Sequence, residues 1–193
     1  DISRRSFLKR AAALSAAAAI PSFWIPSKAN AMPGVPFVSA NEKVRIAFIG
    51  IGNRGGEIAQ ELYKTGLCEV VALCDVDMGA PHTQKLISMF PKVPRFQDFR
   101  QMFDKMADKI DAVTVGVPDH AHFPITIEAM AHGKHVYVEK PLARTFYEAE
   151  LLMQAALKRP NLATQVGNQG HSEANYFQFK AWMDAGIIKD VTA

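Results

Sequence analysis

The stretch VRIAFIGIGNRG, residues 44–55, joins a short, mostly apolar run to the glycine pattern G-x-G-x-x-G. Such a run is typical of a buried parallel strand, and the glycines are expected to turn the chain from that strand into a helix. Gly50 allows the tight turn, Gly52 lets the backbone approach a diphosphate, and Gly55 lets the helix pack close to the strand. The helix N-terminus offers free N–H groups and a partial positive charge to phosphates, which predicts a dinucleotide site.

A carboxylate follows this turn at the end of the next predicted strand. Asp75 lies twenty positions after Gly55, where a carboxylate can accept from both ribose hydroxyls of NAD and would repel the 2′-phosphate of NADP. The sequence therefore predicts NAD in preference to NADP, with Asn53 and Arg54 included in the cofactor site. Asp77 is an alternative for the ribose contact. A P-loop is excluded because the chain has no Gly-Lys-Ser/Thr, whereas these residues alone leave open a methyltransferase or a tight turn without a ligand.

The rest of the chain alternates between apolar, strand-like runs and helical runs. The predicted strands are residues 44–49, 69–73, 95–97, 112–117, 135–138 and 162–166, and the predicted helices are residues 55–65, 81–90, 99–107, 123–131, 145–157 and 176–185. Thr145 followed by Glu148 is a capping box, which marks the start of one of these helices. Strict alternation predicts an α/β fold with a doubly wound parallel sheet of the Rossmann type, in which ligands bind along one edge, where the strands end.

Two further motifs lie at that predicted edge. The stretch VPDHAH, residues 117–122, ends the fourth strand, and GKHVYVEKP, residues 133–141, forms the fifth strand and its exit. Here the sequence resembles the Gfo/Idh/MocA family of oxidoreductases, whose patterns at these places are like T-P-N-x-x-H and G-K-H-V-x-x-E-K-P. The second pattern is matched in full, and the first is matched with Val117 for Thr and Asp119 for Asn. The resemblance covers about residues 43–193.

The resemblance implies a pyridine-dinucleotide oxidoreductase that acts mostly on sugars or cyclitols. It places Lys140 beside the nicotinamide and the reacting hydroxyl as a catalytic residue, with Glu139 and Pro118 lining the nicotinamide side. Asp119 and His122 join the predicted cofactor contacts, and His122 is also a catalytic candidate. The chemistry agrees, because a lysine at a strand end, fixed by the following proline, can donate to an oxygen where negative charge develops. A solvated turn lysine is the plain alternative.

The exit of the sixth strand, GNQGHS at residues 167–172, resembles a segment of exported members of the family, although many members have an arginine there. Asn168 and Gln169 are candidates for the nicotinamide pocket, and His171 could also face it; a plain loop is equally open. His120 and His122 form an H-x-H pair, but no third ligand has suggestive spacing, so no metal site is predicted.

The remaining histidines and the cysteines carry no predicted chemistry. No role is assigned to His82, His132 or His135. Cys68 and Cys74 fall at the two ends of one predicted strand, around residues 69–73, and six residues of strand span roughly 20 Å, which is beyond the reach of a disulfide bond.

The first residues are predicted to be an export signal. SRRSFLK, residues 3–9, matches the twin-arginine consensus, and an alanine-rich run is followed by the small-x-small site Ala29-Asn30-Ala31. Pro21 and Pro26 argue against the alternative of an N-terminal helix of the mature protein. The apolar run is about fifteen residues, short of the roughly twenty that a membrane span needs. The twin-arginine route carries folded proteins, so a periplasmic protein with a tightly bound cofactor is expected.

These signals give a domain plan. Residues 1–31 are the predicted signal, 32–42 an N-terminal arm, 43–167 the Rossmann domain, and 168–193 the incomplete beginning of an open-sheet α/β C-terminal domain. In the family that second domain binds substrate, supplies a catalytic histidine and helps to form oligomers, so we expect a homo-oligomer at full length. A new strand is predicted to start over residues 187–192.

Charge and composition argue against a nucleic-acid partner. The chain is 49% hydrophobic and 21% charged, with a formal net charge of +3. Four of its positive charges lie in the first ten residues, so removal of the signal leaves the protein close to neutral. The only predicted membrane contact is the transient one during export.

An exported NAD-dependent protein must keep its cofactor bound and regenerate it within each cycle, because the periplasm has no evident supply. One such chemistry couples the oxidation of one sugar to the reduction of another. The other oxidises a sugar transiently, lets a neighbouring group eliminate and then reduces the product, which is net hydrolysis or epimerisation. A non-catalytic binding protein on the same scaffold is the competing class, and the presence of Lys140 disfavours it.

Overall fold

The computed structural model describes residues 43–191 of the 193-residue chain. The predicted export signal, its cleavage site and the whole arm lie outside the described residues. None of the helices in the described part is long and apolar enough to cross a membrane.

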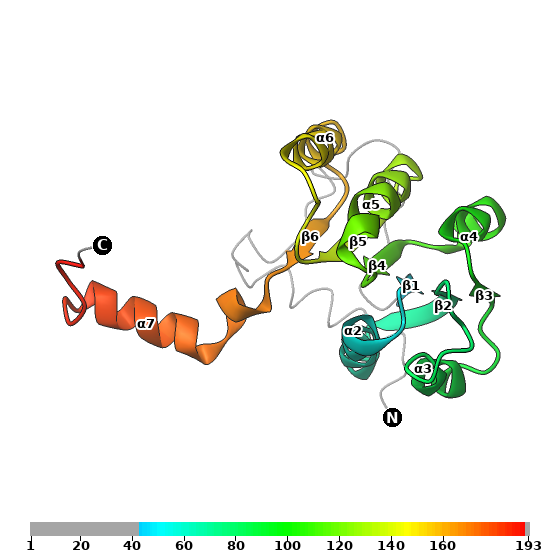
Figure 1. Cartoon of the computed structure of the whole chain (residues 1–193), viewed down its shortest axis with the longest axis horizontal. Coiled ribbons are helices and arrows are strands. Elements are labelled where there is room, and N and C mark those ends of the chain that lie inside the picture. Colours follow the sequence, from blue (N-terminus) through cyan, green and yellow to red (C-terminus); the bar gives the residue numbers. More distant parts are fainter. Residues whose placement is uncertain (1–42, 192–193) are drawn as a thin grey trace, which may run out of the picture. The chain divides into compact units, whose positions relative to one another are not determined.

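A six-stranded parallel sheet forms the centre of the described region (Figure 1). Its strands are β1 (Val44–Ile49), β2 (Cys68–Cys74), β3 (Arg95–Phe96), β4 (Ala112–Val115), β5 (His135–Glu139) and β6 (Thr164–Gly167). They lie in the order β3-β2-β1-β4-β5-β6, and all pairs are parallel. This order reverses between β1 and β4, which confirms the doubly wound Rossmann fold.

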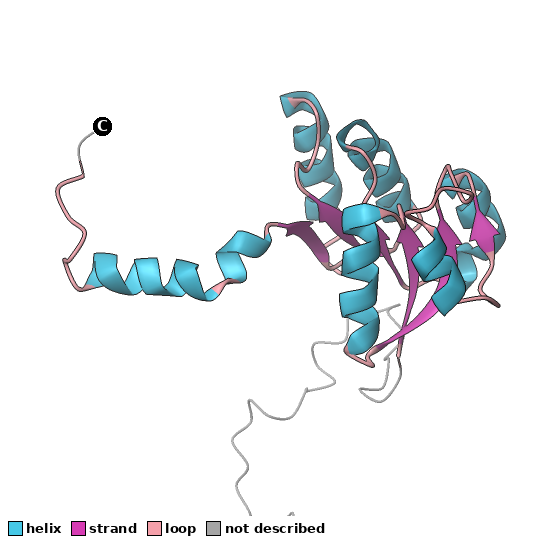
Figure 2. Cartoon of the chain, turned by 60° about the horizontal axis from the view of Figure 1, so that its bottom comes forward, coloured by secondary structure: helices cyan, strands magenta, loops and turns pink. Residues whose placement is uncertain are grey.

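Helices cover both faces of this sheet (Figures 1 and 2). They are α2 (Asn53–Lys64), α3 (Gln84–Met89), α4 (Phe99–Met106), α5 (His122–Ala131) and α6 (Phe146–Leu157). A further helix, α7 (Ala174–Asp184), buries none of its residues in the described structure. Single 3₁₀ turns are η3 (Ala107–Lys109), η4 (Asp119–Ala121) and η5 (Gln169–Ser172). One core packs α2 and α3 against β1 and β2, and the other packs α4, α5 and α6 on the opposite face.

The side chains of β1 point alternately to the two faces of the sheet, and this explains why β1 lies at the centre of the sheet. Ile46 and Phe48 point into the core under α2 and α3, whereas Ala47 and Ile49 point into the other core. All four are buried, and a strand buried on both faces reads as a nearly continuous apolar run.

The predicted elements are confirmed with shifted ends. The capping box of α6 is present: the hydroxyl of Thr145 accepts from the backbone N–H of Glu148 at 3.1 Å, and the Glu148 carboxylate accepts from the backbone of Thr145 at 3.2 Å. Both cysteines are free and buried on β2, as expected. The strand predicted over residues 187–192 is wrong for the part described, because residues 187–191 form no strand. A strand needs a neighbour to satisfy its backbone groups, and no described strand lies beside this segment.

Candidate functional site

The glycine turn brings β1, α2 and the end of β4 into close contact. Gly50 has φ +78°, and a Cβ there would lie 2.5 Å from the carbonyl oxygen of Gly116. A Cβ on Gly55 would lie 2.1 Å from the carbonyl oxygen of Gly50. Real Cβ atoms do not approach so closely, so both positions require glycine if α2 is to start at the carboxyl end of β1.

The first turn of α2 presents backbone donors without a competing side chain. Gly52 is the N-cap, no side chain caps the helix, and the first turn contains no acidic residue. The first intrahelical bond runs from the N–H of Gly56 to the carbonyl of Gly52 at 3.1 Å, so the preceding N–H groups have no partner within the helix. Asn53 has φ +43°, a conformation that asparagine tolerates better than most residues. These features fit a dinucleotide diphosphate.

Asp75 ties the end of β2 to this turn. One carboxylate oxygen accepts from the backbone N–H of Ile51 at 2.9 Å, and the other accepts from the N–H of Asp77 at 3.0 Å. A carboxylate oxygen can accept more than one hydrogen bond, so both retain capacity for ribose hydroxyls. Asp77 instead shapes its own loop, since its carboxylate accepts from the N–H of Gly79 at 3.1 Å. Of the two carboxylates, Asp75 is therefore the one that contacts the glycine turn.

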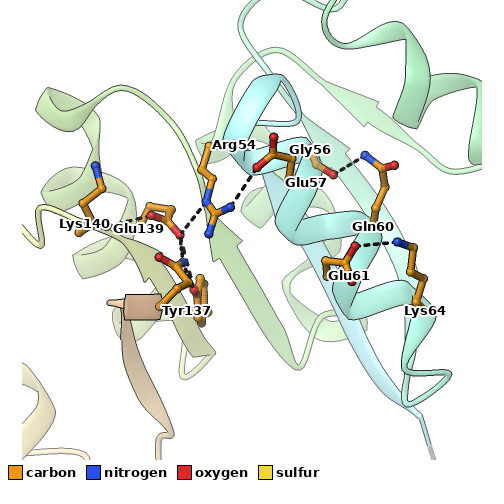
Figure 3. Close-up of polar contacts among 10 residues, drawn as sticks. Arg54, Gly56, Glu57, Gln60, Glu61, Lys64, Tyr137, Glu139 and Lys140 are labelled. Atoms are coloured by element: carbon orange, nitrogen blue, oxygen red, sulfur yellow. Dashed lines mark hydrogen bonds and ion pairs between the residues drawn. The ribbon is translucent and has the colours of Figure 1, made fainter. Parts of the chain in front are cut away.

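The exit of β5 carries a buried carboxylate within a polar cluster (Figure 3). Glu139 is only 4% exposed and accepts a short hydrogen bond from the Gln169 amide. The same amide donates to the Tyr137 hydroxyl at 2.7 Å, and the Arg54 guanidinium reaches within 3.7 Å of the Glu139 carboxylate. Burial, and then the charge of Glu139, raises the pKa of the Tyr137 hydroxyl. The cluster thus links the glycine turn, through Arg54, to the exits of β5 and β6.

Lys140 follows directly and is exposed. In Figure 3 its side chain points away from the Glu139 carboxylate, while its backbone N–H lies 3.4 Å from that group. The peptide bond between Lys140 and Pro141 is cis. The ammonium group is thus presented at the sheet edge that carries the glycine turn.

His122 is buried and holds two strand exits together. It is 1% exposed, and its ring nitrogens lie 2.9 Å from the carbonyl oxygen of Val117 and 2.5 Å from that of Pro141. Both ring nitrogens of His122 are thus engaged by backbone carbonyls. These contacts give His122 a positioning role between the β4 and β5 exits, and its role as a catalytic and cofactor-contacting residue stays a prediction.

The other predicted site residues are placed less specifically. Pro118, Asp119 and Asn168 are exposed at the exits of β4 and β6, and the hydrogen bonds of the described residues include none from the Asp119 or Asn168 side chain. Within residues 43–191, no group of three or more potential ligands could hold a metal ion. One residue without a predicted role does lie at the site: His82 packs against Gly52, and no spacing rule in the sequence signals this contact.

Comparison with known proteins agrees with this geometry. Residues 44–168 match the family described as "Oxidoreductase family, NAD-binding Rossmann fold". Glycosyl hydrolase family 109 protein 1 of Shewanella sp. (strain ANA-3) is 31% identical over 172 residues, which cover 81% of this chain and 37% of that protein. An alpha-N-acetylgalactosaminidase of Shewanella oneidensis is 30% identical, again over 81% of this chain and 37% of that protein.

Similar solved structures include two dehydrogenases of cyclitols. Myo-inositol 2-dehydrogenase from Lactobacillus plantarum is 26% identical with a TM-score of 0.69, and the match covers 78% of this chain and 43% of that one. Scyllo-inositol dehydrogenase from Lactobacillus casei, with bound NAD(H) and scyllo-inositol, is 25% identical with a TM-score of 0.67, over 78% of this chain and 44% of that one. The chain spans less than half the length of each of these relatives.

Proposed function

The chain belongs to the Gfo/Idh/MocA oxidoreductase family with its NAD-binding Rossmann fold, and on that premise we propose that it serves an NAD-dependent oxidoreductase of a sugar or cyclitol. The observation that carries the proposal is the shared sheet edge. There the glycine turn after β1, Asp75 after β2 and Lys140 after β5 come together at strand ends. A tight glycine turn that binds no ligand would not require the exposed Lys140 beside the buried Glu139 at that edge.

The residues present fit the cofactor. The uncapped N-terminus of α2 would hold the diphosphate, and Asp75 would hold the adenosine ribose. When bound, NAD supplies a nicotinamide ring that accepts hydride from an alcohol carbon and returns it to a carbonyl carbon.

Lys140 provides the electrostatic part of the chemistry. Its exposed ammonium group can donate a hydrogen bond to the substrate oxygen, where charge develops as an alcohol and a carbonyl interconvert. Glu139 lies buried directly before it, and its carboxylate is held by Gln169 and Arg54. We assign Glu139 to the wall of the nicotinamide side, together with Pro118 and Asp119, because all three lie at exits of β4 and β5.

Export of the loaded protein is part of the proposal. The twin-arginine pattern at residues 3–9 supports transport after folding, with NAD already bound. We propose that the cofactor stays bound in the periplasm and is regenerated within each catalytic cycle.

A second candidate is redox-neutral glycoside hydrolysis. The names of two relatives, a glycosyl hydrolase family 109 protein and an alpha-N-acetylgalactosaminidase, favour it. The same residues would serve, because transient oxidation and later reduction of one sugar need the same cofactor site and the same donor to oxygen. The difference is that an aglycone leaves between the two redox steps and no net electron transfer occurs.

The proposal is tested on the purified protein by two measurements. Denaturation should release NAD(H), detected by absorbance, and Lys140→Ala should lower turnover on a panel of sugars and cyclitols by two to four orders of magnitude, roughly 2.7–5 kcal/mol. The matched control is Lys158→Ala, which removes an exposed lysine at the end of α6. No released dinucleotide and no NAD binding would refute the cofactor assignment, and near-normal turnover of Lys140→Ala would refute its catalytic role.

The two chemistries separate in one assay. An aryl α-N-acetylgalactosaminide should release its phenol without a net absorbance change at the NADH band if the protein is a hydrolase. A coupled oxidoreductase should instead convert a pair of free sugars, one oxidised and one reduced, and leave the aryl glycoside intact.

A further inference from the structure

We propose that His82 is a ligand of the cofactor's diphosphate, which adds an imidazole donor to the glycine turn. The proposal rests on the proposed NAD function and names a residue that the glycine pattern does not contain. The observation is a contact: a Cβ on Gly52 would lie 2.0 Å from Cδ2 and 2.9 Å from Nε2 of the His82 ring. The imidazole therefore lies against Gly52, the glycine at which the backbone approaches the diphosphate.

The loop before α3 fixes the position of His82. The hydroxyl of the next residue, Thr83, is buried and donates to the carbonyl oxygen of Ala80 at 2.8 Å. The Gln84 amide donates to the carbonyl oxygen of Met78 at 2.8 Å. Because the two residues that follow the histidine are tied to the loop, its backbone is held beside the turn, while His82 itself is exposed.

The chemistry of the ring suits a phosphate oxygen. The side-chain hydrogen bonds of this loop involve Asp77, Thr83 and Gln84. Among the described residues none engages either nitrogen of His82, so a donor is available in every protonation state. An oxygen that accepts from the first N–H groups of α2 lies beside Gly52 and hence near Nε2. The charged groups around this place are Asp75 and Asp77 at the exit of β2 and Arg54 on α2, so a neutral or cationic donor opposes the carboxylates that would repel phosphate.

The opposite reading is that the ring only blocks the turn and must leave before the cofactor binds. The two possibilities predict opposite effects of removing the His82 ring on the affinity for the cofactor. Loss of a ligand weakens binding, whereas loss of a plug tightens it.

The test is calorimetric titration of the purified protein with three probes: NAD, ADP-ribose, which keeps the diphosphate but lacks nicotinamide, and adenosine, which lacks phosphate. His82→Ala should weaken NAD and ADP-ribose by roughly tenfold, the effect of one hydrogen bond to a charged group, and leave adenosine unchanged. His82→Gln, which keeps an N–H donor, should restore most of the affinity. His132→Ala removes an exposed imidazole at the end of α5 and should change nothing.

The outcomes that overturn the proposal are distinct. Tighter or unchanged binding by His82→Ala would identify a plug or a bystander, and His82→Gln as weak as His82→Ala would exclude the donor role. An equal loss of adenosine affinity would move the contact away from the diphosphate. If the wild-type protein bound neither NAD nor ADP-ribose, the proposed function itself would fail. Titration of the wild-type protein alone gives that result, independently of the His82 variants.

Discussion

Glu139 and Lys140 are neighbours in sequence, but burial gives them different chemistry. The Glu139 carboxylate is held by Gln169 and Arg54 beneath the surface, whereas Lys140 is exposed beside it. An exposed ammonium group keeps its three donors for an incoming oxygen, while a buried carboxylate without partners would be costly. Gln169 and Arg54 are therefore necessary parts of the site.

Asp75 should set the choice between the two dinucleotides. A carboxylate at the ribose end should weaken NADP relative to NAD by on the order of 1–3 kcal/mol, roughly ten- to a hundredfold. Asp75→Asn should reduce that preference because it removes the charge and keeps one acceptor for the turn. Titration of both dinucleotides against both proteins measures the effect. Equal or tighter binding of NADP by the wild type would assign the ribose contact elsewhere.

The ion pair between Arg45 and Asp111 should make the free energy of unfolding depend on pH in the acidic range. The hydrogen bond from the Arg45 guanidinium, 2.6 Å long, lowers the pKa of the Asp111 carboxyl, against a smaller opposing effect of burial. A carboxyl whose pKa is lower in the folded than in the unfolded state stabilises the fold. This stabilisation is fully present well above the unfolded-state pKa, about 3.9, and is lost as the pH falls through the folded-state pKa.

The corresponding variant is Asp111→Asn. Because both side chains are more than one-third exposed, it should cost about 1 kcal/mol or less at pH 7, and the difference from wild type should be smaller at pH 3. Urea unfolding at the two pH values measures both quantities. Glu61→Gln breaks the more exposed pair with Lys64 and serves as the control. A difference at pH 3 as large as that at pH 7 would show that the loss is not electrostatic.

Part of the site could be predicted at this scale. The glycines and Asp75 follow from spacing, because strand, turn and helix fix their relative places. His82 could not be predicted, since its contact with Gly52 depends on how the loop of residues 76–83 folds. The sequence places His122 at a strand end but does not reveal that its ring nitrogens face two backbone carbonyls.

At the scale of elements, periodicity predicted every strand of the sheet and the helices that cover it. The ends moved where local chemistry decides: α2 begins at Asn53, because Gly52 serves as its N-cap. The predicted strand over residues 187–192 failed in its described part because apolar composition cannot supply a neighbouring strand. The parallel direction of the strands could be predicted because strands and helices alternate along the chain, which leaves few sheet topologies open.

The two cysteines of β2 should not react with thiol reagents in the native fold. Burial raises the pKa of the Cys74 thiol to about 12 and raises that of Cys68 as well. The thiolate is the reactive form, so neither residue should react with N-ethylmaleimide at pH 8. Both should react after unfolding in urea, and mass spectrometry counts the adducts. Alkylation of Cys74 in the folded protein would mean that β2 opens, or that its packing differs from that described.

At the scale of the whole molecule, the N-terminal segment should decide where the protein works. Export through the twin-arginine route should be followed by cleavage after Ala31, so the periplasmic protein should begin at Met32. N-terminal sequencing of that fraction checks the prediction, and Arg4→Lys with Arg5→Lys should abolish export while leaving NAD binding intact. Retention of residues 3–31 on periplasmic protein would contradict cleavage.

The contact of Gly116 with the glycine turn has a consequence for how such a chain can evolve. Gly116 lies outside the G-x-G-x-x-G pattern, yet a Cβ on it would lie 2.6 Å from the Cα of Gly55. In a saturation library of single variants, position 116 should therefore tolerate substitution as poorly as positions 50 and 55, even when selection is for folding alone. The inherited unit is thus a cluster of glycines in space, drawn from two segments more than sixty residues apart in the sequence that follow β1 and β4, and the linear pattern omits Gly116.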